Sequence, residues 1–192
     1  MQQLDTQTPR NTGVLPADFR FTLRRFSRID DVPMKEAKAL LHAHAVMMHG
    51  RMVAAGGPDF DINDHLNAFW DSFEAYMPPH GCYYLAYDRD GSIVGTGSLK
   101  RLSGTTAEMK HLYVKPEARR AGLGEALVKA RIKDARDMGI RELVADTFAA
   151  NHEQPALYDK IGFERVGPSE MSATGQISPE LEPFMLFFRM AL

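Results

Sequence analysis

The chain contains little cysteine and no long apolar segment, and both scarcities exclude classes of protein. Its single cysteine, Cys82, provides neither an intramolecular disulfide nor a cysteine-based metal cluster, which favours a reducing compartment. No segment approaches the roughly 20 apolar residues of a membrane span. The first residues lack the basic start and the apolar run of a signal peptide. We therefore expect a cytoplasmic protein that has no membrane partner.

A large excess of charge of one sign is also absent. The chain carries 23 Lys and Arg against 25 Asp and Glu, whereas a general nucleic-acid-binding protein needs a strongly basic face. We therefore expect no nucleic-acid partner. Basic residues nevertheless gather in one region, where they would attract an anionic ligand. They are Lys110, Lys115, Arg119, Arg120, Lys129, Arg131, Lys133 and Arg136.

Hydrophobic periodicity predicts one α/β domain after a polar lead-in. Residues 1–18 are polar and are expected to be loosely ordered, and residues 19–192 are enough for a single domain. The expected strands cover residues 19–26, 82–88, 92–99, 108–114 and 142–147, a short strand after Gly162-Phe163, and residues 184–190. The expected helices cover residues 30–48, 61–77, 122–138 and 155–161. This order predicts a mixed sheet flanked by helices.

Residues 108–125 form the most informative segment, because they read as a strand, a tight basic turn and a helix. Lys115-Pro116 ends the strand, since proline cannot donate to a strand ladder. Gly122 and Gly124 let the backbone approach a ligand, and the first amides of the next helix have no intrahelical acceptors. A pyrophosphate group fits such a place. Two glycines at this spacing also occur in turns that bind nothing.

Three segments together resemble the GCN5-related N-acetyltransferase (GNAT) superfamily. Arg119-x-x-Gly122-x-Gly124 is similar to the family's phosphate-binding turn, and Leu112-Tyr113-Val114 is similar to the strand before it. Residues 151–163 resemble the family's pattern of an asparagine followed by Leu-Tyr and Gly-Phe, although Gln154 stands where alanine is common. The resemblance covers nearly the whole chain after Phe19. It implies the family's splayed mixed β-sheet and a single N-acetyltransferase domain over residues 19–192.

The resemblance also implies the cosubstrate and the residues that bind it. Acetyl-CoA would be held without a metal, mainly by the backbone of the turn and of the strand before it. The implied cofactor-binding residues are Leu112, Tyr113, Val114, Arg119, Arg120, Ala121, Gly122, Leu123, Gly124, Glu125, Asn151 and Tyr158.

Two residues have an implied catalytic role. Tyr158 would return a proton to the leaving thiolate, because a phenol with a pKa of about 10 stays protonated at neutral pH. Tyr158 also has a purely structural interpretation, as a helix residue that packs on Phe163. Glu108 would remove a proton from the attacking amine, with His111 as another candidate. As a strand residue, His111 should share a face with Met109 and Tyr113, away from Leu112.

The implied reaction is transfer of an acetyl group to a primary amine of a small molecule or a peptide, by direct attack on the thioester. Two alternatives remain open, namely a non-catalytic acyl-CoA-binding or sensing module and a transferase for a longer acyl group. The apolar last strand is compatible with a homodimer. Acids at Glu170, Glu180 and Glu182 would favour a cationic acceptor, or they form a solvated loop.

Several other side chains invite a role. His42, His44 and His49 lie on one expected helix, but their spacing and the lack of a completing carboxylate or cysteine motif argue against a metal site. Trp70 or Tyr76 is expected to line an acceptor pocket. The polar Arg131 interrupts the apolar face of its helix, where it would either extend to solvent or meet a ligand.

Overall fold

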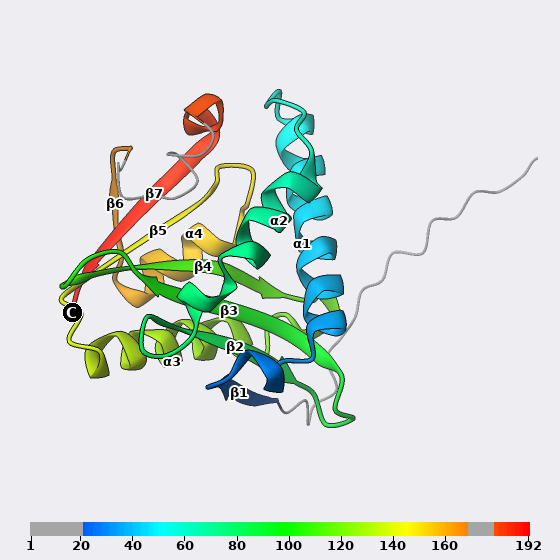
Figure 1. Ribbon diagram of the computed structural model, residues 1–192. Helices are drawn as coiled ribbons and strands as arrows, with labels where there is room; N and C mark the ends of the chain where they lie inside the picture. Colours follow the sequence, from blue (N-terminus) through cyan, green and yellow to red (C-terminus); the bar gives the residue numbers. More distant parts are fainter. Residues whose placement is uncertain (1–20, 169–178) are drawn as a thin grey trace, which may run out of the picture.

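The computed structural model describes residues 21–168 and 179–192, and this part forms one seven-stranded sheet with helices on both faces (Figure 1). The expected lead-in at residues 1–18 lies outside the described residues. The strand order is β1-β2-β3-β4-β5-β7-β6. The strands are β1 (Thr22–Phe26), β2 (Gly81–Tyr87), β3 (Ile93–Arg101), β4 (Thr106–Val114), β5 (Glu142–Phe148), β6 (Glu164–Val166) and β7 (Met185–Ala191). The predicted α/β class and mixed sheet are therefore confirmed.

Two pairs of helices cover the two faces of the sheet. The helices are α1 (Met34–Ala54), α2 (Ile62–Asp71), α3 (Leu123–Asp137) and α4 (Glu153–Ile161). One core packs α3 and α4 against the sheet, and a second core packs α1 and α2 against the opposite face. None of the helices in the described part of the chain is long and apolar enough to cross a bilayer.

The helix expected over residues 61–77 ends early. The Ser72 hydroxyl donates to the carbonyl of Ala68 at 2.8 Å, which competes with the backbone ladder of α2. A short 3-10 helix, Phe73–Tyr76, follows. α1 is instead longer than expected and continues to Ala54 rather than ending at Met48.

The sheet splays between β4 and β5, its parallel pair of neighbouring strands. Their pairing runs from Thr106 opposite Glu142 to Met109 opposite Ala145. Beyond that point β4 continues to Val114 and β5 to Phe148 without paired residues, and Figure 1 shows β5 and β7 diverging from β3 and β4. The splay leaves the backbone at the end of β4 without a neighbour on that side. It confirms the splayed sheet that the family resemblance implied.

A bulge in β4 places His111 on the face of Tyr113 and away from Leu112, as expected, but not on the face of Met109. His111 has a φ of 55°, and the β3–β4 register shifts opposite it, between Thr96 and Ser98. A bulge adds one residue to a strand and reverses the alternation beyond it. Met109 therefore packs in the α3 core while Tyr113 packs in the α1–α2 core. His111 contacts Phe69 of α2, with 3.9 Å between ring centroids.

Arg131 of α3 is fully buried beneath the same bulge, so it neither extends to solvent nor lines a cavity. Its guanidinium donates to the carbonyls of Leu127, Ser98 and Lys110 at 3.0, 3.1 and 3.2 Å. A Cβ atom on Gly97 would lie 3.0 Å from Arg131 Nε, so the glycine makes room for the guanidinium. Arg131 therefore supplies further donors to carbonyls of α3, β3 and β4 beside the irregularity.

We expect Arg131→Ala to lower the free energy of unfolding by about 3 kcal/mol, because it removes the hydrogen bonds of a buried guanidinium and leaves a cavity in its place. Urea unfolding monitored by circular dichroism measures this change. Lys133→Ala, two residues along α3, is the matched control, since Lys133 is exposed and pairs with Asp137 one turn away. Equal stability of the Arg131 variant and the control would mean that the hydrogen bonds of Arg131 do not stabilise the fold.

Candidate functional site

Two connected cavities lie where the sheet splays. The outer cavity, of about 530 Å³, runs along the end of β4, the turn after it and the start of α3. The inner cavity, of about 120 Å³, lies between β4, β5, α1 and the start of α2. Both walls include His44, Met48, Leu112 and Gln154, so the cavities meet at these four residues.

The turn at the outer cavity has an unusual backbone. Arg120 and Gly122 have φ values of 64° and 80°, in the left-handed region that L-residues other than glycine rarely adopt. Alternation of left-handed and ordinary residues turns successive amide groups toward one point, which makes an anion-binding concavity. The helix α3 begins at the next residue, so its unpaired first amides and its dipole add to the same effect.

The two glycines of the turn serve different purposes. Gly122 needs its positive φ, while a Cβ atom there would meet nothing within 4 Å. A Cβ atom on Gly124 would lie 3.3 Å from Leu157 Cδ2, so Gly124 lets α3 and α4 pack closely. Gly122 thus sets the direction of the amides, and Gly124 sets the width of the cavity beside them.

The side chain of Arg119 links the turn to the end of β4 and to α4. Its Nε donates to the carbonyl of Val114 at 3.0 Å, and its Nη1 pairs with Glu153 at 3.0 Å. Glu153 also accepts two hydrogen bonds from Arg51 of α1, at 2.7 and 3.1 Å. The hydrogen bonds from Arg51, followed by the charges of both arginines, lower the pKa of Glu153 to about 2. One ionised carboxylate therefore links α1, the turn and α4.

Asn151 and Gln154 form the wall opposite the turn. Asn151 Nδ2 donates to Thr147 Oγ1 at 2.9 Å and to Gln154 Oε1 at 3.0 Å. Gln154 Nε2 donates to the hydroxyl of Tyr158 at 2.9 Å. Tyr158 is fully buried, and burial raises the pKa of its phenol. The predicted acid residue therefore stays protonated and lies directly behind Gln154, a residue that sequence reasoning had treated as a departure from the family pattern.

Most of the predicted cofactor-binding residues are brought together in one wall. The outer cavity is lined by Leu112, Tyr113, Val114, Arg119, Arg120, Gly122, Leu123, Gly124, Glu125 and Asn151. Ala121 and Tyr158 are not in that wall. Tyr158 instead packs on Phe163, with 4.7 Å between ring centroids, as its structural interpretation expected.

Glu108 lies away from both cavities. Its side chain is fully buried, and its two carboxylate oxygens lie 3.8 Å from Lys100 Nζ and 3.7 Å from Lys110 Nζ. Glu108 is in the wall of neither cavity, although Lys110, which it contacts, lines the inner one. The placement does not favour Glu108 as the general base.

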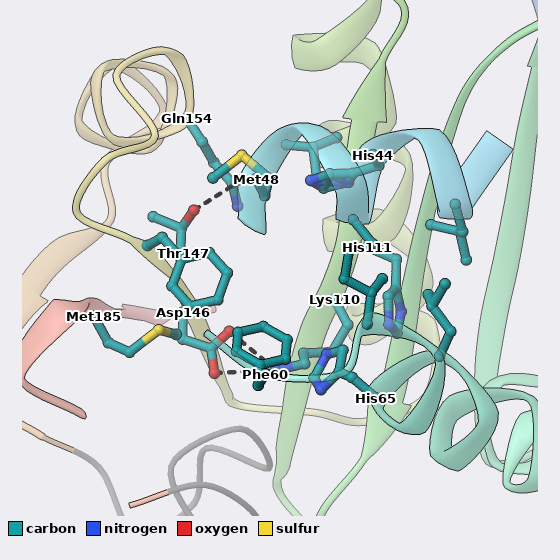
Figure 2. A pocket seen from close by; sticks show the side chains of 16 residues that line it. His44, Met48, Phe60, His65, Lys110, His111, Asp146, Thr147, Gln154 and Met185 are labelled. Carbon is teal, nitrogen blue, oxygen red and sulfur yellow. Dashed lines mark hydrogen bonds and ion pairs between the residues drawn. The ribbon is translucent and has the colours of Figure 1, made fainter. Parts of the chain in front are cut away.

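The inner cavity combines apolar walls with three imidazoles and one ion pair (Figure 2). Lys110 Nζ lies 3.0 Å from both carboxylate oxygens of Asp146. Burial lowers the pKa of all three imidazoles, to about 4 for His44, and nearby cations lower them further. Those cations are Arg119 and Arg51 for His44, and chiefly Lys110 for His65 and His111. The surroundings of these imidazoles therefore disfavour an added positive charge, whereas Asp146 and Glu108 raise the pKa of Lys110 in the same cavity.

Trp70 and Tyr76, which were expected to line an acceptor pocket, line neither of the two cavities. The inner wall contains Ile62, His65 and Leu66 rather than Trp70 or Tyr76. The spacing of three and four residues from Ile62 to His65 and Leu66 could have identified this group from the sequence. However, the apolar stripe of the same helix continues into residues that pack in the core. No group of three or more His, Cys, Asp or Glu side chains within residues 21–168 and 179–192 is arranged to hold a metal ion.

The sequence profile of the Acetyltransferase (GNAT) family matches residues 52–163, which include both cavities' central walls. The chain belongs to this family. Several curated relatives that match the chain are also named N-acetyltransferases. An uncharacterized N-acetyltransferase of Schizosaccharomyces pombe is 36% identical over 94 residues, which are 48% of this chain and 58% of the relative.

Two further relatives extend this pattern. An uncharacterized N-acetyltransferase of Escherichia coli is 29% identical over 112 residues, 57% of this chain and 66% of the relative. Human N-acetyltransferase 8 is 32% identical over 104 residues, 52% of this chain and 46% of the relative. The chain thus spans about half the length of the curated relatives it matches.

Solved GNAT structures share the fold of this member. A GNAT-family acetyltransferase from Staphylococcus aureus superposes with a TM-score of 0.67 at 15% identity, over 89% of this chain and 99% of that one. A GNAT-family acetyltransferase from Elizabethkingia anophelis, solved with acetyl-CoA bound, gives a TM-score of 0.59 at 19% identity, over 90% and 98% of the two chains. At these identities the likeness concerns the fold alone.

Proposed function

We propose that this GNAT-family member is an N-acetyltransferase that moves the acetyl group of acetyl-CoA to a primary amine. The observation that carries the proposal is the amide concavity at Arg120–Gly122, which opens into a cavity that continues to a second, inner cavity. An anion-binding turn at one end and a separate compartment at the other end suit a two-substrate transfer. Acetyl-CoA supplies an acetyl group activated as a thioester.

The outer cavity is assigned to acetyl-CoA. The amides of residues 120–125 would bind the pyrophosphate, because they converge and carry the positive end of the α3 dipole. The backbone of Leu112 and Val114, which lacks a neighbouring strand on the splayed side, would pair with the pantetheine arm. Asn151 lines the opposite wall and would contact the same arm.

The inner cavity is assigned to the acceptor amine. Its size suits a body of a few carbon atoms, since an apolar protein cavity of about 150 Å³ holds benzene. An acceptor must be neutral to attack, and the part of the inner cavity beside His44 and His111 would favour that form without a dedicated base. Burial and the cations that lower the pKa of His44 and His111 would lower the pKa of a bound ammonium in the same way.

The chemical step is a direct attack. The amine nitrogen forms a bond to the thioester carbon, the carbon–sulfur bond then breaks, and the amine releases one proton to solvent. The departing thiolate takes up a proton, which Tyr158 would donate from behind Gln154 and then recover from solvent. His44 and Gln154, at the junction of the two cavities, would line the reacting thioester.

Thermal stability tests acetyl-CoA binding first. At a concentration 100-fold above Kd, we expect acetyl-CoA to stabilise the protein by about 2.7 kcal/mol, which raises Tm by about 5–10 °C for a chain of this size. Release of free thiol with a panel of small primary amines then tests transfer. No shift in Tm would argue against the proposal.

The same two measurements separate the alternatives. A sensing module would show the shift in Tm but no thiol release with any amine. A transferase for a longer acyl group would turn over butyryl-CoA faster than acetyl-CoA, because a longer chain would extend into the inner cavity.

The pH dependence of transfer tests how the neutral amine is obtained. With n-butylamine, we expect kcat/KM to rise with pH toward the pKa of the free amine, about 10, because only the neutral form binds productively. We expect kcat to stay level to much lower pH, because the cavity lowers the pKa of the bound amine. Steady-state rates from pH 6 to pH 10 give both profiles. If kcat and kcat/KM fall together with one pKa near that of the free amine, the cavity does not have this effect.

A further inference from the structure

We propose that Gln154 is a positioning residue that keeps the hydroxyl hydrogen of Tyr158 free for the leaving sulfur. The inference rests on the proposed function. It follows from the direction of the hydrogen bonds that join Asn151, Gln154 and Tyr158. Each direction can be assigned, because one end of the chain of bonds is a backbone N–H group, which only donates.

The first direction is fixed at Asn151. Its Oδ1 accepts from the backbone N–H of Gln154 at 3.4 Å, where α4 begins. The other group of the same amide must therefore be Nδ2, which donates to Thr147 Oγ1 and to the side chain of Gln154. An amide flipped at Asn151 would set a donor against a donor.

The second direction follows from the first. Because Asn151 Nδ2 donates, Gln154 must present its oxygen, Oε1, at 3.0 Å. Its nitrogen, Nε2, is left facing the hydroxyl of Tyr158 at 2.9 Å. An amide nitrogen donates and does not accept, so the phenol oxygen accepts this bond. The hydroxyl hydrogen of Tyr158 is therefore not donated to Gln154.

The neighbouring cation does not accept that hydrogen either. The buried guanidinium of Arg131 interacts with Tyr158, and a guanidinium only donates. Within residues 21–168 and 179–192, no acceptor lies within hydrogen-bonding distance of the Tyr158 hydroxyl. The phenol is thus surrounded by donors, and its hydrogen is available to an acceptor that arrives with the substrate. Gln154 lines both cavities, so that acceptor would arrive beside it.

Gln154→Glu tests the direction of the bond, because it keeps the length and shape of the side chain but replaces the donor with an acceptor. An ionised carboxylate there would take the hydrogen of Tyr158. We expect kcat with acetyl-CoA and n-butylamine to fall at least 10-fold, and KM for acetyl-CoA to change less than threefold. Gln154→Ala removes the donor without adding an acceptor, so its kcat should fall less than that of Gln154→Glu.

The pH dependence distinguishes orientation from general damage. Once the introduced carboxyl is protonated it can donate again, so the ratio of kcat for Gln154→Glu to kcat for the wild type should rise as pH falls. The corresponding ratio for Gln154→Ala should stay constant. A pH-independent ratio for Gln154→Glu, or a kcat equal to that of the wild type, would overturn the inference.

A double variant locates the effect at Tyr158. In a Tyr158→Phe background, Gln154→Glu should cause no further loss of kcat, since no hydroxyl hydrogen remains to be misdirected. A further loss of 10-fold in that background would mean that Gln154 acts elsewhere.

A spectroscopic reading separates this inference from the proposed function. A downfield Tyr158 hydroxyl proton resonance, bound to the carboxylate, should appear in the ¹H NMR spectrum of Gln154→Glu and be absent from that of the wild type, and Tyr158→Phe should abolish it. If the wild type releases no thiol with any amine, the proposed function fails and the comparison of the two spectra still decides the direction of the bond. The same hydrogen-bonded hydroxyl resonance in the wild type would overturn the inference itself.

Discussion

Tyr158→Phe should lower kcat about 100-fold and leave the shift in Tm caused by acetyl-CoA in place. The substitution removes only the hydroxyl, which would protonate the thiolate, and general acids typically contribute 10²–10⁴-fold to a rate. Binding is preserved because Tyr158 is absent from the wall of the outer cavity. Thiol release at saturating acetyl-CoA and n-butylamine gives kcat, and thermal unfolding gives the shift.

Phe163→Leu is the matched control for this variant. Phe163 is buried and packs against the Tyr158 ring, so its replacement disturbs the same core without removing the hydroxyl. We expect kcat within threefold of the wild type. Unchanged turnover in Tyr158→Phe would exclude the acid role, and an equal loss in both variants would assign it to packing.

Gly122→Val should weaken acetyl-CoA binding at least 10-fold. The backbone of residue 122 has a φ of 80°, where a side chain costs about 1–2 kcal/mol and a β-branched one is a severe outlier. The turn would relax to a negative φ, and the amides that converge on the pyrophosphate would no longer do so. Isothermal titration calorimetry with acetyl-CoA measures the change in Kd.

Gly139→Val provides a control with the same backbone strain. Gly139 follows the other end of α3, has a φ of 76°, and a Cβ atom there would meet nothing within 4 Å. The control should lose stability but retain its Kd for acetyl-CoA. Equal weakening by both variants would mean that strain in α3, rather than the direction of the amides, governs binding.

The sequence allowed most of the fold to be predicted, because the relevant signals are local. The alternation in residues 82–99 gave the β2–β3 hairpin, and Gly122 and Gly139 bracketed α3 within a residue or two. The early end of α2 was missed because the Ser72 side chain competes with the helix backbone there. The length of α1 was missed because that helix has exposed apolar residues such as Val46, which blur its periodicity.

The parts of the candidate site that depend on local sequence could likewise be predicted, and the parts that depend on tertiary structure could not. The turn at Arg119–Gly124 is contiguous in sequence and could be recognised, and it lines one cavity with Leu112 and Val114 as expected. The inner cavity could not be predicted, because its walls come from six helices and strands that only the tertiary structure brings together. The assignment of roles to the site residues stays a prediction, as do the cytoplasmic location and the homodimer.

The bulge at His111 has a consequence for how this protein tolerates changes in chain length. It places Met109 and Tyr113 on opposite faces of one strand, although they are four positions apart and would share a face in a regular strand. Deleting one residue there would restore regular alternation and rotate Leu112–Val114 by half a turn relative to the rest of the sheet. We therefore expect β4 to accept many substitutions but no deletion. Related sequences that align here with a gap should have lost the present arrangement of both cavities.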